Sequence, residues 1–145
     1  MRRLFLRALT AAAIALAPAA ALATGEITVY KSPTCGCCTK WVDHLKDNGF
    51  TVRAEDVRDI NAVKARYGVM PHLASCHTAV VDGYIVEGHV PADTIKRLLR
   101  ERPAVKGVTV PGMPVGSPGM EGPNPERYDV LTFDAQGRAQ VYTRH

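Results

Sequence analysis

Three cysteines within four residues, the run Cys35-Gly36-Cys37-Cys38, constrain this chain more than any other feature. They follow an apolar, strand-like stretch, residues 27–30, and stand at the start of a segment with helical periodicity. The outer pair, Cys35 and Cys38, has the Cys-x-x-Cys spacing of thioredoxin-type redox sites. Cys37 is one thiol more than that chemistry needs, and crowded thiolates suit Cu(I), Zn(II) or iron–sulfur clusters. The run therefore indicates either electron transfer to disulfides or capture of a soft metal.

Cys76 is the fourth cysteine, and His77 follows it directly. Four cysteines in an exported protein often form two structural disulfides, with three pairings available. Here the neighbours Cys37 and Cys38 can hardly pair without strain, and the short loops closed within the run restrict the unfolded chain least. The pattern therefore favours a metal or redox role over a structural one.

Residues 1–23 have the pattern of a cleavable secretory signal peptide. An Ala/Leu/Ile run follows a basic start and ends at the small-x-small site Ala21-Leu22-Ala23. A membrane anchor is the alternative, but the run is short for a span of about 20 residues and contains Pro18. We therefore expect this segment to be removed, with no membrane span left afterwards.

Removal of the signal changes the charge of the protein. The whole chain has 18 basic and 14 acidic residues, and three of the basic ones are in the signal: Arg2, Arg3 and Arg7. The mature protein is then nearly neutral and has no basic stripe for nucleic acid or a membrane surface. Export through an Ala-rich signal predicts the bacterial periplasm, where disulfides persist.

The remaining residues, 24–145, predict one α/β domain. The expected elements are strands at 27–30 and 50–54, helices at 37–48 and 60–67, a hairpin at 78–81 and 84–86, and a helix from 91 to 102. This order is thioredoxin-like, with a parallel strand pair joined by the first helix and antiparallel strands added by the hairpin. The cysteine run falls at the strand-to-helix turn, where backbone N–H groups lower the pKa of a thiol.

The same order of elements predicts which distant residues lie beside the cysteine run. The residue before the first hairpin strand faces this turn in such a fold, and His77 occupies that position. Pro71 is the competing candidate but stands seven residues before the strand. We therefore expect Cys76 and His77 to approach Cys35.

The last third of the chain is different in kind. Residues 104–125 are crowded with Gly and Pro and predict a long irregular loop. The loop repeats Pro-Gly-Met at 111–113 and 118–120. Residues 128–143 predict a second β-hairpin, added at the C-terminus.

The combination of motifs resembles a known family. Besides the cysteine run, the motifs are Ser75-Cys76-His77-Thr78-Ala79, Asp82-Gly83-Tyr84, Glu87-Gly88-His89-Val90-Pro91 and the Pro/Gly/Met segment 111–120. Together they resemble the CopG-type periplasmic copper-resistance proteins, which are distinct from the ribbon-helix-helix repressors of the same name. The resemblance implies a thioredoxin-like fold, Cu(I) bound in a multinuclear thiolate cluster, and a redox role. The ligands it implies are Cys35, Cys37, Cys38 and Cys76.

Four further side chains are candidate ligands: His77, His89, Met113 and Met120. Imidazole accepts copper or zinc and thioethers are soft ligands for Cu(I), but a lone histidine is more often structural and methionines often fill gaps. The alternative metal is one zinc held by all four cysteines, or by three of them and a histidine. We expect His44 on a helix surface and Trp41 in the core.

The sequence thus predicts a periplasmic protein that sequesters or relays Cu(I) in copper resistance. Its expected partners are copper ions and other periplasmic copper-handling proteins, not nucleic acid. The alternative is a thiol–disulfide or copper oxidoreductase with Cys35 as nucleophile and Cys38 as resolving thiol. A structural disulfide module is the third interpretation. No nucleotide, haem or phosphate motif is found in the sequence.

Overall fold

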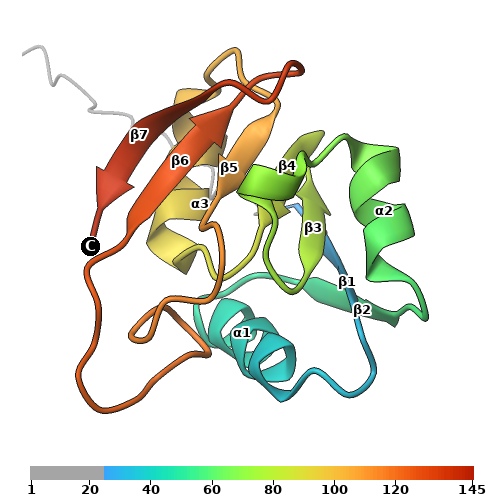
Figure 1. Cartoon of the computed structure of the whole chain (residues 1–145), viewed down its shortest axis with the longest axis vertical. Helices are drawn as coiled ribbons and strands as arrows, with labels where there is room; N and C mark the ends of the chain where they lie inside the picture. Colours follow the sequence, from blue (N-terminus) through green and yellow to red (C-terminus); the bar gives the residue numbers. More distant parts are fainter. Residues whose placement is uncertain (1–24) are drawn as a thin grey trace, which may run out of the picture.

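The computed structural model describes residues 25–145, so the predicted signal peptide, residues 1–23, lies outside the described part of the chain. Its strands are β1 (Ile27–Lys31), β2 (Val52–Asp56), β3 (Thr78–Val81), β4 (Tyr84–Glu87), β5 (Gly107–Thr109), β6 (Asp129–Phe133) and β7 (Ala139–Arg144). Its helices are α1 (Gly36–Asp47), α2 (Ile60–Tyr67), α3 (Ala92–Glu101) and a short 3-10 helix, η1 (Pro71–Leu73). Within residues 25–145 the seven strands form one sheet in the order β2-β1-β3-β4-β5-β6-β7 (Figure 1).

The first half of the sheet has the predicted topology. β1 and β2 are parallel, with Ile27 opposite Val52, and α1 joins them. β3 lies antiparallel to β1, and β4 pairs antiparallel with β3. The hairpin turns at Asp82 and Gly83, whose φ values of 49° and 83° are those that an Asp-Gly pair tolerates.

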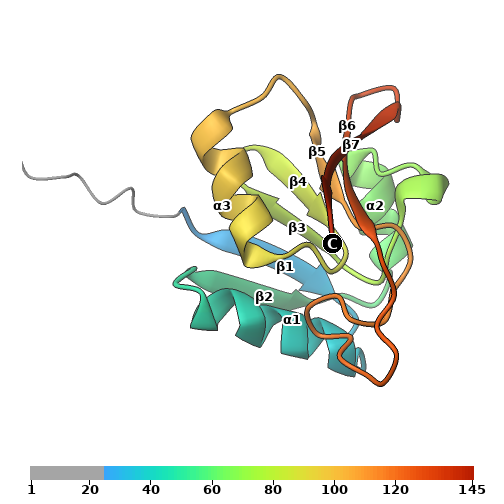
Figure 2. The same cartoon turned by 90° about the vertical axis from the view of Figure 1, so that its left-hand side faces the viewer.

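Helices cover both faces of the sheet and enclose two apolar clusters. α1 and α3 lie on one side and α2 on the other (Figure 2). The larger cluster includes Trp41 and Leu45 of α1 together with Ile95 and Leu98 of α3. The smaller cluster lies on the α2 side and contains Val69, Leu73, Ile85 and Phe133. The mixed α/β class is thereby confirmed, while the thioredoxin-like assignment stays a prediction.

Capping residues set the helix bounds close to those expected. The side chain of Asp59 accepts a hydrogen bond from the N–H of Ala62, and Gly68 ends α2 in the left-handed conformation with φ 68°. α1 begins one residue earlier than predicted, at Gly36, because Cys35 serves as its N-cap. The cysteine run therefore forms the first turn of this helix.

The segment 104–125 is not entirely a loop. β5 occupies three of its residues and pairs with β4 in parallel and with β6 in antiparallel orientation. All three residues are buried, so the strand depends on neighbours on both sides, and three residues give no periodic signal. The predicted C-terminal hairpin is present as β6 and β7 and extends the sheet through β5.

One smaller difference concerns a strand position. β2 starts two residues later than the predicted strand 50–54. No helix within residues 25–145 is long and apolar enough to cross a membrane.

Candidate metal centre

The start of α1 presents three cysteine side chains together. Cys35 has an extended backbone, and its sulfur accepts a hydrogen bond from the N–H of Cys38 at 3.3 Å. Cys38 is fully buried, whereas Cys35 and Cys37 are half-buried. The unpaired N–H groups and the dipole at the start of a helix favour negative charge in general.

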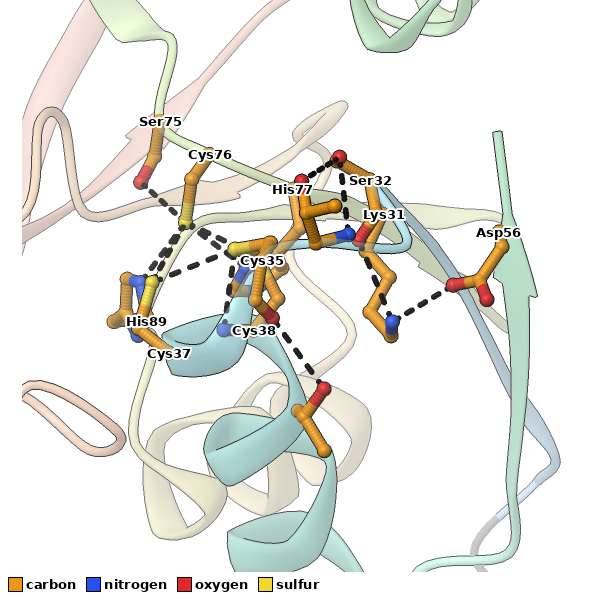
Figure 3. The surroundings of a disulfide bond; sticks show 12 residues. Lys31, Ser32, Cys35, Cys37, Cys38, Asp56, Ser75, Cys76, His77 and His89 are labelled. Carbon is orange, nitrogen blue, oxygen red and sulfur yellow. Dashed lines mark hydrogen bonds and ion pairs between the residues drawn. A yellow bond between two sulfur atoms is a disulfide. The ribbon is translucent and has the colours of Figure 1, made fainter. Parts of the chain in front are cut away.

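Cys76 completes a compact group of four sulfur atoms. It stands just before β3, beside β1 in the sheet, and its side chain points at the α1 turn (Figure 3). Its Sγ lies 3.5 Å from that of Cys38 and 3.9 Å from that of Cys37, and the sulfurs of Cys37 and Cys35 are 3.4 Å apart. All four sulfurs lie within 4.8 Å of one another. The predicted approach of Cys76 to the run is therefore present.

The four cysteines are not all free thiols. Cys35 and Cys38 form a disulfide, while Cys37 and Cys76 are free. The structure thus has the Cys-x-x-Cys pair in its oxidised form, with two further thiols against it. Reduction would convert the group into four thiols in the same place.

Two histidines extend this group on the side of Cys76. His89 Nε2 lies 3.0 Å and His77 Nδ1 3.4 Å from the Cys76 sulfur. Cys76, His77 and His89 form a second cluster of donor atoms within 4.8 Å of one another. Cys76 belongs to both clusters and therefore connects the sulfur donors to the nitrogen donors.

Hydrogen bonding fixes the tautomer of His89. Its Nδ1 lies 2.8 Å from the carbonyl oxygen of Pro118, which can only accept, so Nδ1 carries the proton. Nε2 then has its lone pair towards Cys76. Sequence reasoning did not single out the Pro118 carbonyl, since a backbone atom leaves no residue pattern.

His77 is held by burial and ring contacts. Its ring lies 4.3 Å from that of Trp41 and 4.9 Å from that of His89, between centroids. Its Nε2 is buried and has no hydrogen-bond partner among the described residues. Burial lowers the pKa of His77 well below its usual value and also lowers that of His89. Both imidazoles are therefore neutral and retain a lone pair for a metal.

Without a metal, the Cys76 thiol stays protonated at neutral pH. Burial, followed by the nearby Cys37, raises the pKa of Cys76 to about 12. A coordinating cation reverses this balance, because thiols bind metals as thiolates. The donor set of four sulfurs and two neutral imidazoles fits a soft or borderline metal.

The Pro/Gly/Met loop packs on the cysteine run. A Cβ on Gly119, which has φ 87°, would lie 2.7 Å from the carbonyl oxygen of Cys37. Met120 is half-buried and lines a cavity with Cys37 and Lys40. Met113 is 51% exposed. Met120 therefore lies beside a cysteine of the run, whereas the Met113 side chain is largely in solvent.

The other residues weighed from the sequence have structural contacts. Trp41 is fully buried and its Nε1 donates to the carbonyl of Val90 at 2.9 Å, as expected for a core residue. His44 lies on α1 and is half-buried, and its Nε2 also accepts a hydrogen bond from the N–H of Ala92 in the first turn of α3.

Sequence reasoning missed a buried ion pair between Lys64 and Glu87. Glu87 accepts a hydrogen bond from the N–H of Ser75, the residue before Cys76. The only signal of this pair in the sequence is a charged residue at the end of an apolar strand.

Comparisons with known proteins identify the relatives of this chain. A family described as "Protein of unknown function, DUF411" matches residues 73–120. Two solved structures named "Copper resistance protein copG", Form 1 and Form 2, are each similar to the chain at 46% sequence identity. Each match covers 84% of this chain and 98% of the other, with a TM-score of 0.79. A search of curated proteins finds no match.

Proposed function

The chain belongs to the CopG family of copper resistance proteins, and on that premise we propose that it binds Cu(I) through Cys35, Cys37, Cys38 and Cys76. The observation that carries the proposal is the group of four sulfur atoms within 4.8 Å of one another. Thiolates are the soft ligands that select Cu(I), and copper is here the cargo of the protein. Its role is to sequester or relay the ion.

More than one copper per chain is expected. A thiolate can bridge two Cu(I) ions. Apart from the bonded Cys35–Cys38 pair, neighbouring sulfurs lie 3.4 to 3.9 Å apart, so the four cysteines in their reduced form can support a multinuclear cluster. His77 and His89 add two nitrogen donors, which makes six donors in all. A structural zinc site uses four, so the donor number favours a cluster over a single zinc.

A redox function is the second candidate, and the Cys35–Cys38 disulfide favours it. Cys35 caps α1 and suits a nucleophile, while buried Cys38 suits the resolving thiol. The two functions are compatible, because closing this disulfide removes two of the four thiols. In exchange with a substrate disulfide, the two thiols would form the Cys35–Cys38 disulfide and release Cu(I), while the substrate disulfide is reduced to two thiols. Exchange with a dithiol reductant would restore the site.

We place this function in the periplasm. One support is the predicted signal peptide, residues 1–23. The other is the Cys35–Cys38 disulfide, because disulfides persist in the oxidising periplasm. The partners we propose are copper ions and other periplasmic copper-handling proteins.

An anaerobic titration tests the metal-binding proposal. Reduced protein from residue 24 onward is titrated with Cu(I) against a competing chelator, and tightly held copper is counted. We expect two or more ions per chain in the wild type and fewer in Cys37→Ser. The control is His72→Gln, since His72 bonds to Gly137 and does not contact the sulfurs. One copper or none, with no loss in Cys37→Ser, would overturn the cluster and favour the oxidoreductase.

A further inference from the structure

A buried ion pair lies at the end of β4, on the α2 face of the sheet. Glu87 is fully buried, and Lys64 of α2 is 6% exposed. Their closest atoms, Lys64 Nζ and Glu87 Oε1, are 2.5 Å apart. Burying two charges costs so much desolvation that such a pair is weak evidence for stability. Its presence therefore calls for another reason.

The Glu87 carboxylate holds both ends of the segment that carries Cys76. Its Oε1 accepts a hydrogen bond from the N–H of Ser75 at 2.7 Å. Its Oε2 accepts one from the Thr78 hydroxyl at 2.6 Å. Lys64 Nζ also donates to that hydroxyl at 3.2 Å. One side chain thus fixes the residues on either side of the Cys76-His77 pair.

This segment needs such a support because the sheet does not supply it. Cys76 and His77 precede β3 and lie outside the strand ladder. The sheet reaches this pair through the hydrogen bond from the N–H of Gly88 to the carbonyl oxygen of His77, at 3.1 Å. Glu87 therefore does for this short stretch what ladder hydrogen bonds do within a strand.

We propose that Glu87, held by Lys64, is a positioning residue that sets where the Cys76 sulfur lies relative to the three cysteines of α1. The inference rests on the proposed Cu(I) site and adds a determinant of its affinity. Neither residue belongs to the two groups of candidate donor atoms. Groups that orient metal ligands commonly change affinity by about 10- to 100-fold when they are removed.

Paired variants separate positioning from charge. Lys64→Met/Glu87→Leu removes both charges and the acceptors for Ser75 and Thr78. Lys64→Met/Glu87→Gln also removes both charges but keeps an oxygen for the Ser75 N–H and a donor for the Thr78 hydroxyl. Ile85→Ala is the stability control, because Ile85 lies on β4 with Glu87 and packs in the smaller apolar cluster. Its side chain makes no hydrogen bond to Lys64 or Glu87.

Copper affinity is the first measurement. In chelator competition with reduced protein, we expect the Leu double variant to bind Cu(I) about 10- to 100-fold more weakly. The Gln double variant should recover most of this loss, and Ile85→Ala should bind as the wild type does. Wild-type affinity in the Leu double variant, or equal losses in all three, would overturn the inference.

A measurement without copper keeps the inference distinct from the proposed function. With Cys35–Cys38 closed and Cys37→Ser in the background, Cys76 is the one thiol left, and its alkylation rate by iodoacetamide reports its placement. We expect the alkylation rate of Cys76 to change several-fold in the Leu double variant and little in the Gln double variant. Thr78→Val, which removes one hydrogen bond at nearly constant volume, should show a smaller change and covers the case in which the Leu variant does not fold. Unchanged rates throughout would refute the positioning role, whereas a wild type without copper affinity would refute only the metal site.

Discussion

The sulfur half and the imidazole half of the candidate metal centre are constrained in different ways. Cys35 and Cys37 are half-buried at a helix start, and the Cys35–Cys38 pair is oxidised. His77 and His89 are fully buried and held neutral, with one of them tied to the Pro118 carbonyl. The sulfur half can therefore change its number of donors with redox state, whereas the imidazole half is fixed. Cys76 joins the two halves.

The largest effect expected from this difference concerns redox state. Reduced protein should hold more than one Cu(I) per chain, because four thiols are available. Protein with Cys35–Cys38 closed should hold at most one, on Cys76 and the histidines, since only two free thiols remain. Native mass spectrometry of the two forms measures the copper count.

The Cys35→Ser/Cys38→Ser variant is the control for this comparison. It cannot form the disulfide, so its copper count should equal that of the oxidised wild type with or without reductant. Equal counts in the reduced and oxidised wild type would show that the sulfur half is not switched.

The second effect concerns His77 and pH in the metal-free protein. Its pKa is lowered by burial, so below pH 6.5 the unfolded chain takes up a proton that the folded chain cannot. The free energy of unfolding should therefore have its full value above pH 6.5. It should decrease as the pH drops below 6.5, by up to about 1.4 kcal/mol per pH unit for each such histidine. His77→Leu, of similar volume, should flatten this slope. Urea denaturation between pH 7.5 and 5 measures it.

The same variant distinguishes a ligand from a core residue. Because His77 Nε2 is buried and has no hydrogen-bond partner within residues 25–145, Leu should leave the metal-free protein at pH 7.5 as stable as the wild type, or more stable. Its Cu(I) affinity should fall if the ring binds metal. Lower stability with wild-type copper affinity would instead assign His77 to packing against Trp41.

The two halves were not equally predictable from the sequence. The order of elements predicted that Cys76 and His77 lie beside the cysteine run, because residues just before the first hairpin strand have few possible neighbours in the sheet. The capping chemistry of Asp59 and Gly68 explains why the observed bounds of α2 match the predicted helix 60–67. Local chemistry of this kind is carried by the residues themselves, so it can be recognised without a structure.

What depends on distant partners could not be predicted. β5 is three buried residues that exist as a strand only between β4 and β6. From the sequence, Glu87 is only a polar residue at the end of a strand. Its contacts with Lys64 and Ser75 arise from the packing of distant segments. By contrast, the Cys-x-x-Cys spacing did indicate the pair that forms the disulfide, Cys35 and Cys38. Pairing and burial by remote segments are set by tertiary packing, which leaves little local signal.

The smallest effect separates the two candidate methionines of the loop. Met120 is half-buried and shares a cavity with Cys37, whereas Met113 is 51% exposed. Leucine replaces methionine at similar volume, so the fold should tolerate either change, at a cost below about 1.5 kcal/mol. Met120→Leu should then weaken Cu(I) binding by less than tenfold, because a neutral thioether adds one weak donor to several thiolates. Met113→Leu should bind as the wild type does, by the same chelator competition. An equal or larger loss in Met113→Leu would mean that the loop closes over the sulfur half when copper binds.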